Sequence, residues 1–597
     1  MKRLFIYLKD YKKESVIAPL FKMLEALFDL MVPLVVASII NRGIKYGDKP
    51  YIYRMCGVLI LLAAVGLLCA LCAQYFAAKA AVGFAAKLRC ALFSHIQSLS
   101  FTELDIQGTS ALMNRMTSDV NQLQNGVNMA LRLLMRSPFI VFGAMIMAFT
   151  VNAQAAFTFV VVIPVLFAIV FGIICATLPL YKRVQERLDQ VLRRTRENLT
   201  GVRVIRAFHR EWEETEEFCE DNGLLKRQQL FVGKISALMN PLTYVVVNLG
   251  IIALLANGGV KVSVGTMEQG DVVALIDYMS QILVELVKLA NTVVLLTRAI
   301  ASGRRVAGVF EVSSSMAFPQ VTGGNDAPVS GGPRDVLQGM DSDEIVSFSH
   351  VDLTYAGAGG QSLSDITFSV RRGQTVGVIG GTGSGKTSLV HLIPRFYDAT
   401  GGEVRVCGRD VKTYGREELR ERVGIVMQKA VLFQGTIREN LHWGRPDASD
   451  EQLWRALETA QAREVVEGKA GGLAEMVEQG GRNFSGGQRQ RLAIARTLVK
   501  EPDILILDDS ASALDYATDA RLRMAIASLD PKPTVFIVSQ RAASVLYADL
   551  ILVLDEGKIV GQGTHEELLQ GCPIYREIYE SQFDSKDWKG GQTHDGR

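Results

Sequence analysis

The sequence has no excess of charge of either sign, and this absence limits the kinds of partner that the protein can have. Its 597 residues include 64 lysines and arginines against 62 aspartates and glutamates, for a net charge of +2 at pH 7. A chain that binds nucleic acid usually carries a basic surplus or a basic run. We therefore expect no nucleic-acid partner.

Cysteine patterns that hold a metal ion or carry redox chemistry are also missing. The pair Cys69 and Cys72 has CxxC spacing, but it lies inside an uncharged apolar segment and no second pair accompanies it.

A cleavable signal peptide is not indicated either. The basic start, MKRLFIYLKDYKK, leads into a long apolar segment rather than a short apolar core with a cleavage site.

Several long segments in the first half of the chain carry no charged residue, and such segments predict helices that cross a membrane. Apolar residues make up 49% of the sequence, which is high for a soluble protein. A helix that crosses a membrane needs about 20 mainly apolar residues. Six spans are expected, at residues 16–41, 55–78, 137–181 (a hairpin of two spans), 235–260 and 272–297. Asn152 and Gln154 mark the turn of the hairpin.

The segments between the spans predict the orientation in the membrane. Residues 79–130 and 180–234 are long and helical in period, and, like the N-terminus, they carry more lysine and arginine than aspartate and glutamate. The loops predicted near 42–52, 152–155 and 257–270 are short. Because lysine and arginine accumulate on the cytoplasmic side, we expect a multi-pass protein of a cell membrane, that of a bacterium, with both termini in the cytoplasm.

The second half of the chain has a different pattern. Residues 1–311 are the predicted membrane domain, and residues 312–342 are rich in glycine, serine and proline, as in a linker. Residues 343–583 alternate short apolar strands with helices, as in an α/β nucleotide-binding domain. Residues 584–597 are expected to form a disordered tail. The predicted fold class is an α-helical polytopic membrane domain followed by an α/β P-loop NTPase domain.

A glycine-rich stretch, GGTGSGKTS, follows directly on the apolar run Thr375–Ile379. Its glycines let backbone N–H groups turn toward one point and approach an anion closely. Lys386 can reach the β- and γ-phosphates, and the Thr387 hydroxyl can ligate Mg²⁺. A helix that starts near Thr387 adds the positive end of its dipole. The predicted phosphate-binding loop comprises Gly380, Gly381, Thr382, Gly383, Ser384, Gly385, Lys386, Thr387 and Ser388.

Two further motifs follow this loop. Asn483–Gln488 reads NFSGGQ and runs into RQRLAIAR, and Ile504–Asp508 reads ILILD, an apolar strand that ends in a carboxylate suited to the Mg²⁺ shell. With six spans ahead of them, the three motifs in this order resemble the ATP-binding cassette (ABC) family. The whole chain resembles a half-size ABC exporter of the multidrug type. The resemblance implies ATP and Mg²⁺ as cofactors, and ATP hydrolysis coupled to transport.

The resemblance also implies roles for single positions. Tyr355 matches the residue that stacks on adenine; the alternative is a tyrosine in the core of a strand. Asp515 matches the loop that links two ATP sites, and Asn114–Asp119 and Glu197–Phe208 fall where the family has coupling helices. The Mg²⁺ contacts would be Thr387, Gln428 and Asp508. The signature loop, which in this family closes over ATP held by the other subunit, would be Ser485, Gly486, Gly487 and Gln488.

Two positions depart from the family pattern where hydrolysis takes place. The residue after the Walker B aspartate is usually a glutamate that orients or deprotonates the attacking water, and here it is Asp509, shorter by about 1.5 Å. A misplacement of about 1 Å can cost about 10²-fold in rate. Gln540 stands where the family usually has a histidine against the γ-phosphate, and it cannot supply a cation. These degenerate catalytic positions predict a site that binds ATP tightly and hydrolyses it poorly.

The intact signature loop favours a heterodimer. The expected partner is a second ABC half-transporter whose intact catalytic glutamate and switch histidine form a competent site with this chain's signature loop. The expected cargo is a small amphipathic molecule, either drug-like or a lipid. The alternatives are a homodimer, a lipid flippase, a peptide exporter, and an ATP-gated channel or regulator. The peptide case is weakened because no peptidase-like domain precedes the first helix.

Ionisable residues inside two spans predict a substrate pathway. Asp277, Gln281, Glu285 and Lys288 recur at spacings of four, four and three and share one helical face, and Lys22, Glu25 and Asp29 form a similar stripe. A charged group that faces lipid costs about 2.5 to 3.5 kcal/mol. We therefore expect these two helical faces to line an aqueous substrate pathway, while the rest of the membrane domain contacts membrane lipid.

The charge of this cavity is open to two interpretations. One hypothesis is that four carboxylates bias it toward organic cations: Glu25, Asp29, Asp277 and Glu285. The alternative is that Lys22 and Glu25 lie at the cytoplasmic headgroups and that Glu285 and Lys288 neutralise each other.

Overall fold

The computed structural model describes residues 2–319, 343–510 and 512–583, and the chain divides into two compact units. The first unit comprises residues up to Gln97 and Thr109–Val312, and the second comprises Ser98–Gly108 and the described residues from Ser313 onward. Residues 98–108, which were expected in the membrane domain 1–311, group with the second unit, and the predicted domain boundary stays a prediction. Most of the predicted linker 312–342 and all of the predicted tail 584–597 lie outside the described residues.

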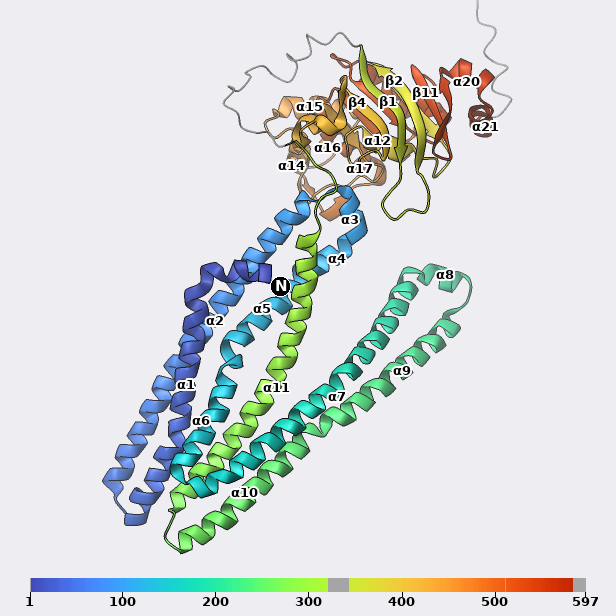
Figure 1. Cartoon of the computed structure of the whole chain (residues 1–597). Coiled ribbons are helices and arrows are strands. Elements are labelled where there is room, and N and C mark those ends of the chain that lie inside the picture. The colour runs from blue at the N-terminus through green and yellow to red at the C-terminus, as the bar shows by residue number, and fades with distance from the viewer. Residues whose placement is uncertain (1, 320–342, 511, 584–597) are drawn as a thin grey trace, which may run out of the picture. The chain divides into compact units, whose positions relative to one another are not determined.

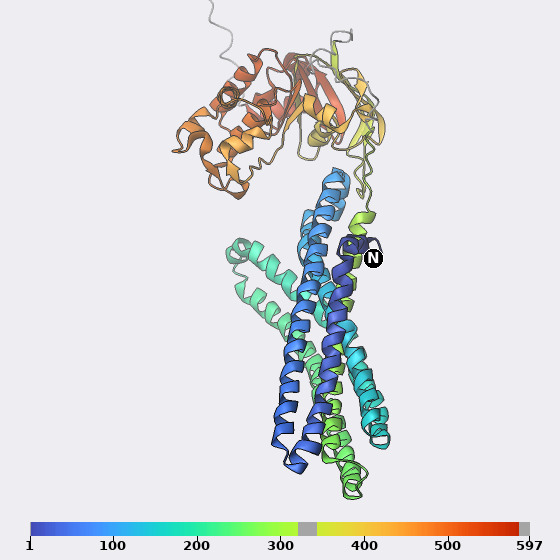
Figure 2. The same ribbon diagram turned by 90° about the vertical axis from the view of Figure 1, so that its left-hand side faces the viewer.

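The described part of the first unit is helical throughout (Figure 1). Its long helices continue well past the apolar segments into the polar stretches, as the periodicity predicted. Helices α7 and α9 lie side by side, as Figure 1 and Figure 2 show. The α-helices are α1 (Lys12–Ser38), α2 (Lys49–Ser98), α4 (Thr109–Asn114), α5 (Val120–Met129), α6 (Arg136–Val151), α7 (Ala153–Thr200), α8 (Val202–Ala207), α9 (Glu211–Ala237), α10 (Met239–Ser263) and α11 (Gln269–Glu311). Wider or tighter turns form η1 (Lys2–Tyr11), η2 (Ile39–Ile44), η3 (Arg115–Asp119) and η4 (Ala130–Leu134).

Five helical stretches in the described part are long and apolar enough to cross a membrane: Leu4–Ile44, Lys49–Ser98, Thr109–Val151, Ala153–Thr200 and Glu211–Ser263. The sixth span expected, residues 272–297, lies on α11 and is not among them. Helix α11 nevertheless packs against α1, α5, α6, α7 and α10. It therefore lies among the other helices of the unit, where Glu285 is buried against protein while Asp277 and Lys288 are exposed.

The predicted hairpin turn is confirmed at Asn152. Helix α6 ends at Val151, and the Asn152 side chain accepts a hydrogen bond from the backbone N–H of Ala155 at 3.0 Å, which caps α7. Lys261 Nζ donates to the same oxygen at 3.0 Å. One asparagine thus ends one helix, starts the next and contacts α10.

The second unit contains two main sheets. The larger has the strand order β12-β11-β3-β10-β9-β6, with all pairs parallel except β11 with β12, and the smaller is antiparallel with the order β2-β1-β4-β5. Every residue of β9 and β10 is buried, as expected for parallel strands covered on both faces. The strands are β1 (Glu344–Leu353), β2 (Leu363–Arg371), β3 (Thr375–Gly380), β4 (Gly401–Val406), β5 (Arg409–Asp410), β6 (Val423–Val426), β7 (Gly435–Thr436), β8 (Met476–Val477), β9 (Ile504–Asp508), β10 (Thr534–Val538), β11 (Leu550–Asp555) and β12 (Lys558–Gly563).

Helices alternate with these strands, which confirms the predicted α/β fold. The carboxyl ends of β3, β9 and β10 are neighbours in the larger sheet, and a crevice at this edge is the usual ligand site of such a fold. The helices are α12 (Lys386–Leu392), α13 (Arg416–Arg422), α14 (Ile437–His442), α15 (Asp450–Thr459), α16 (Arg463–Glu467), α17 (Gly486–Leu498), α18 (Tyr516–Ala527), α19 (Ala542–Val545), α20 (His565–Gly571) and α21 (Pro573–Gln582).

A short helix from the first half of the sequence packs within the second unit. Helix α3 (Phe101–Gln107) places the Phe101 ring 4.6 Å from that of Phe396, and Tyr397 donates a hydrogen bond to Asp105 at 2.7 Å. The segment Asn114–Asp119, which the family resemblance matches to a coupling helix, lies in the first unit, and its role stays a prediction. The aromatic and carboxylate contacts that dock α3 cannot be recognised from the sequence of this segment alone.

Candidate nucleotide-binding site

The glycine-rich stretch forms a tight loop between β3 and α12. Gly383 and Gly385 have φ values of 84° and 96°, which are left-handed conformations that favour glycine. A Cβ atom on Gly385 would lie 2.8 Å from the carbonyl oxygen of Ser362, so no larger residue fits there. Cβ positions on Gly381 and Gly383 would meet nothing within 4 Å, which leaves that side of the loop open to a ligand.

Lys386 is the first residue of α12 and is folded back over the loop. Its Nζ atom donates to the carbonyl oxygens of Gly380 at 2.9 Å and of Gly381 at 2.5 Å. Burial lowers the pKa of this lysine, and the nearby carboxylates of Asp509 and Asp508 oppose that effect. A phosphate group at the loop would favour the charged form of the lysine in the same way.

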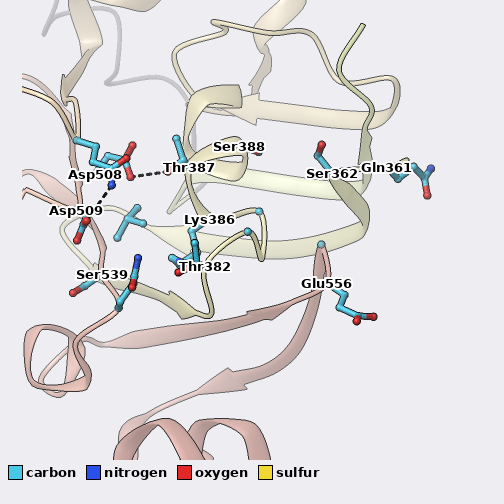
Figure 3. Close-up of a pocket in the computed structure, with 16 residues that line it drawn as sticks. Gln361, Ser362, Thr382, Lys386, Thr387, Ser388, Asp508, Asp509, Ser539 and Glu556 are labelled. Atoms are coloured by element: carbon cyan, nitrogen blue, oxygen red, sulfur yellow. Dashed lines mark hydrogen bonds between the residues drawn. The ribbon is translucent and has the colours of Figure 1, made fainter. Parts of the chain in front are cut away.

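The predicted Mg²⁺ ligands lie together at the same edge. Thr387 Oγ1 donates to Asp508 Oδ1 at 3.0 Å, and Asp508 is 1% exposed (Figure 3). Burial raises the pKa of Asp508, while the hydrogen bond from Thr387 lowers it. The described residues contain no cluster of three histidine, cysteine, aspartate or glutamate side chains that could hold a metal ion. Mg²⁺ usually takes one or two protein oxygens together with phosphate oxygens and water, so Thr387 and Asp508 fit an ion that arrives with a nucleotide.

Both degenerate positions face this site. Asp509 has a φ of 46°, and its backbone N–H donates to the carbonyl of Val538 at 3.0 Å. Gln428 Nε2 donates to the Asp509 carboxylate at 3.2 Å (Figure 3). Gln540 follows β10 and lines the same cavity. The cavity has a volume of about 510 Å³ and is lined by Gln361, Ser362, Thr382, Gly383, Gly385, Lys386, Thr387, Ser388, Gln428, Asp508, Asp509, Val538, Ser539, Gln540, Glu556 and Gly557.

Several residues of this lining were not predicted. Gln361 and Ser362 precede β2, and Glu556 and Gly557 form the two-residue turn between β11 and β12 with φ values of 44° and 80°. Gly557 is the sequence signal for that turn, because glycine readily adopts the positive φ that a tight hairpin requires. Its position beside the phosphate loop depends on the pairing of β11 with β3 and carries no local signal.

The predicted adenine-stacking residue lies beside the cavity rather than in its lining. Tyr355 is half-buried, its hydroxyl donates to Ser388 Oγ at 3.0 Å, and its ring meets that of Tyr397 edge to face at 4.9 Å. Burial raises the pKa of the Tyr355 hydroxyl. The role in stacking stays a prediction.

Substitution of Tyr355 can test that role. We expect Tyr355→Ala to weaken ATP binding about 10-fold, because the loss of base–aromatic stacking costs about 1 to 3 kcal/mol. Tyr355→Phe keeps the ring and should change the affinity less than about threefold. Competition by tripolyphosphate, which has no base, should be unchanged in both variants. A parallel loss of tripolyphosphate binding in Tyr355→Ala would mean that the residue supports the loop rather than the base.

The signature motif lies outside this cavity. Ser485 caps α17: its hydroxyl accepts from the N–H of Gln488 at 3.3 Å, and Gln488 Oε1 accepts from the N–H of Ser485 at 2.9 Å. Ser485 and Gly486 are exposed. Within one chain, the structure therefore does not bring the phosphate loop and the signature loop into one site.

The predicted substrate-pathway residues of the first unit are mostly paired with cations. Arg136 Nη1 donates to Glu285 at 2.5 Å and its Nη2 donates to Asp29 at 2.9 Å. Lys22 donates to Glu25 at 2.6 Å, and Lys288 donates to Glu285 at 2.9 Å.

The hypothesis that the four carboxylates bias the cavity toward organic cations stays a prediction, and these ion pairs are in keeping with the alternative that neighbouring charges neutralise one another. Three of the carboxylates form ion pairs: Lys22 lies on the same helix as Glu25, whereas Arg136 of α6 reaches Asp29 and Glu285 from a neighbouring helix, and Glu285 is only 3% exposed. Asp277 is exposed and has no ion pair in the described part of the chain. Gln281 is half-buried, and its Oε1 atom has no hydrogen-bond partner among the residues that the structure describes.

The fold and the site together define a nucleotide-binding domain attached to a helical membrane domain. Comparison with known families agrees: the model described as "ABC transporter transmembrane region" matches residues 15–286, and the model described as "ABC transporter" matches residues 363–512.

Relatives match over nearly the whole chain. An uncharacterized ABC transporter ATP-binding protein of Mycobacterium tuberculosis is 37% identical over 96% of this chain and 97% of its own length. A putative multidrug export ATP-binding/permease protein of Bacillus subtilis is 30% identical over 97% and 98%. The solved structure of a bacterial Atm1-family ABC exporter with ATP bound aligns with a TM-score of 0.76 over 98% of this chain and 99% of that one, at 21% identity, and thus shares the fold.

The chain belongs to the ABC transporter family. Its nucleotide-binding domain binds ATP and couples ATP hydrolysis to transport, which confirms the family and the activity that the motifs predicted.

Proposed function

We propose that this chain is one half of a heterodimeric exporter of small amphipathic molecules in a bacterial cytoplasmic membrane, and that its own phosphate loop belongs to a site that retains ATP and hydrolyses it poorly. The observation that carries the proposal is the pair Asp509 and Gln540 on the lining of an otherwise complete ATP cavity. The partner would contribute the catalytic glutamate and histidine of the second, competent site.

The geometry of the site supports weak hydrolysis. The Asp509 carboxylate is attached one methylene closer to the backbone than a glutamate would be, and its oxygen accepts a hydrogen bond from Gln428. Its backbone is fixed in a left-handed conformation by the hydrogen bond to Val538, so the main chain cannot easily move forward to compensate. Gln540 supplies an amide in place of a cation. The residues that bind phosphate, by contrast, are all present.

Restoring both family residues should restore hydrolysis. We expect Asp509→Glu alone to raise turnover at this site less than about threefold, because Gln540 remains. Asp509→Glu combined with Gln540→His should raise it at least about 10-fold, since a misplacement of about 1 Å costs about 10²-fold. The measurement is single-turnover hydrolysis of ATP cross-linked to this chain. Rapid hydrolysis by the unaltered chain would contradict the proposal.

Two further measurements test the assembly and the transport. Purification of the tagged chain from its host should yield a second ABC half with glutamate and histidine at the corresponding positions. Reconstituted vesicles supplied with ATP should accumulate a dye against its gradient, whereas a channel could only dissipate that gradient. Recovery of the chain as a homodimer, or dissipation alone, would favour the alternatives.

A further inference from the structure

The last described helix, α21, is anchored firmly on the nucleotide-binding domain (Figure 1). Tyr575 is fully buried, and its hydroxyl lies 2.8 Å from His565 Nδ1. The rings of Tyr579 and Phe583 stack with centroids 4.6 Å apart. These contacts fix the position of the end of α21, where Gln582 is the last helical residue.

Gln582 reaches from this helix to the loop that carries Gln540. Its Nε2 atom donates to the carbonyl oxygen of Gln540 at 2.8 Å, and its Oε1 atom accepts from the N–H of Ala542 at 2.8 Å. Ala542 is the first residue of α19, so its N–H has no partner inside that helix. One side-chain amide thus satisfies the two backbone groups that flank Arg541.

Arg541 connects this loop to the loop that links the two ATP sites. Its guanidinium donates to the carbonyls of Leu514 at 3.4 Å and Ser512 at 3.3 Å, while its own N–H donates to Ser539 Oγ at 2.9 Å. The backbone at Arg541 therefore sets both the direction of the Gln540 side chain and the position of the guanidinium. Gln582 holds that backbone from the outside.

We propose that Gln582 is a positioning residue for the ATP site: it holds the backbone on both sides of Arg541 so that Gln540 faces the γ-phosphate. It touches neither the nucleotide cavity nor its lining side chains. The inference rests on the proposed function, in which this site retains ATP. Gln582 lies at the C-terminal end of the domain. Its contact with the loop that carries Gln540 would determine how long ATP stays bound.

The test uses three variants of the full chain, purified with its partner. Gln582→Met preserves the length of the side chain and removes both hydrogen bonds, whereas Gln582→Glu preserves the acceptor for Ala542 and removes the donor to Gln540. Ser581→Ala is the matched control, because among the described residues the Ser581 hydroxyl donates to the carbonyl of Ile578 in its own helix. The probe is labelled 8-azido-ATP, bound, chased with unlabelled ATP for increasing times and then cross-linked to this chain.

We expect the retention time of the probe to fall about 5- to 10-fold in Gln582→Met, the effect of two lost hydrogen bonds of modest strength. Gln582→Glu should fall between this variant and the wild type, and Ser581→Ala should match the wild type. In a Gln540→Ala background, Gln582→Met should have no further effect, because the residue acts through Gln540.

Two results would overturn the inference: unchanged retention in folded Gln582→Met and Gln582→Glu, or equal losses in both Gln540 backgrounds, which would indicate only general support of the fold. The chemical form of the retained label separates this outcome from failure of the proposed function. Label recovered as ADP from the wild type would contradict the proposal that this site hydrolyses ATP poorly. The effect of Gln582 on the retention time could still be measured.

Discussion

Gly486→Asp is expected to lower the steady-state ATPase activity of the assembled transporter about 100-fold, whereas Asp509→Ala should lower it less than about twofold. In the proposed assembly the signature loop of this chain completes the competent site of the partner. A carboxylate there would face phosphate, and juxtaposed like charges cost several kcal/mol, or about 100-fold or more. Asp509 belongs to the site that contributes little turnover.

The structure indicates that Gly486→Asp changes the signature loop without disturbing the fold of this chain. A Cβ atom on Gly486 would meet nothing within 4 Å, so the larger side chain does not disturb the fold of this chain. Gly486 is also the first residue of α17, where an acidic side chain favours the helix. Ser485→Arg is less suitable, because loss of the cap costs about 1 kcal/mol of stability. Gly571→Asp is the matched control, since Gly571 is equally open at the end of α20.

The measurement is ATPase activity in lipid with the wild-type partner, together with the melting temperature of each variant. Gly486→Asp and Gly571→Asp should melt within a few degrees of the wild type. Equal losses of activity in Gly486→Asp and Asp509→Ala would show that both sites hydrolyse comparably, and the asymmetric assembly would be wrong.

The parts of the site that could be predicted from the sequence are those built from consecutive residues. In the loop from Gly380 to Ser388, the residues that allow the sharp turn, those predicted to bind phosphate and those that start the helix follow one another in the sequence. The sequence pattern therefore predicts the geometry of the loop. The turn at Asn152 is of the same kind, because one side chain caps the helix that follows it. The burial of β9 and β10 is also indicated by the sequence, because four consecutive residues of each strand are apolar.

The parts that could not be predicted depend on which segments meet. Glu556 lines the cavity only because β11 pairs with β3, and Phe101 docks only because Phe396 lies opposite. The carboxylates on α1 and α11 were placed on common faces by their spacing. Spacing along a helix could not show that Arg136 of α6 would neutralise them, since that contact joins residues 149 positions apart.

The pairing around Arg136 leads to the second large effect, which is on stability. Arg136 is 11% exposed at its side chain and contacts Glu285, Asp29 and, at 3.9 Å, Glu25. Ser137 Oγ donates to the second oxygen of Glu285 at 2.9 Å. The group joins α1, α6 and α11 inside the membrane domain. Removing one partner from a buried ion pair costs about 3 to 5 kcal/mol, because it leaves an uncompensated charge.

Arg136→Gln should therefore lower the melting temperature of the detergent-solubilised transporter sharply, whereas Lys288→Gln, which removes an exposed partner of the same Glu285, should cost less than about 1 kcal/mol. Arg136→Gln combined with Glu285→Gln should recover much of the loss, because the buried Glu285 is then uncharged, although Asp29, whose side chain is 45% exposed, still loses its ion pair. The double-mutant cycle measures the coupling between Arg136 and Glu285. Melting is followed by size-exclusion chromatography after heating. Similar losses of melting temperature in Arg136→Gln and Lys288→Gln would contradict a buried ion pair.

The same ion pairs predict which carboxylate affects export. Since Glu285 is paired with cations, Glu285→Gln should change the export of cationic and uncharged compounds equally. Asp277→Asn should be the substitution that selectively weakens the export of cations.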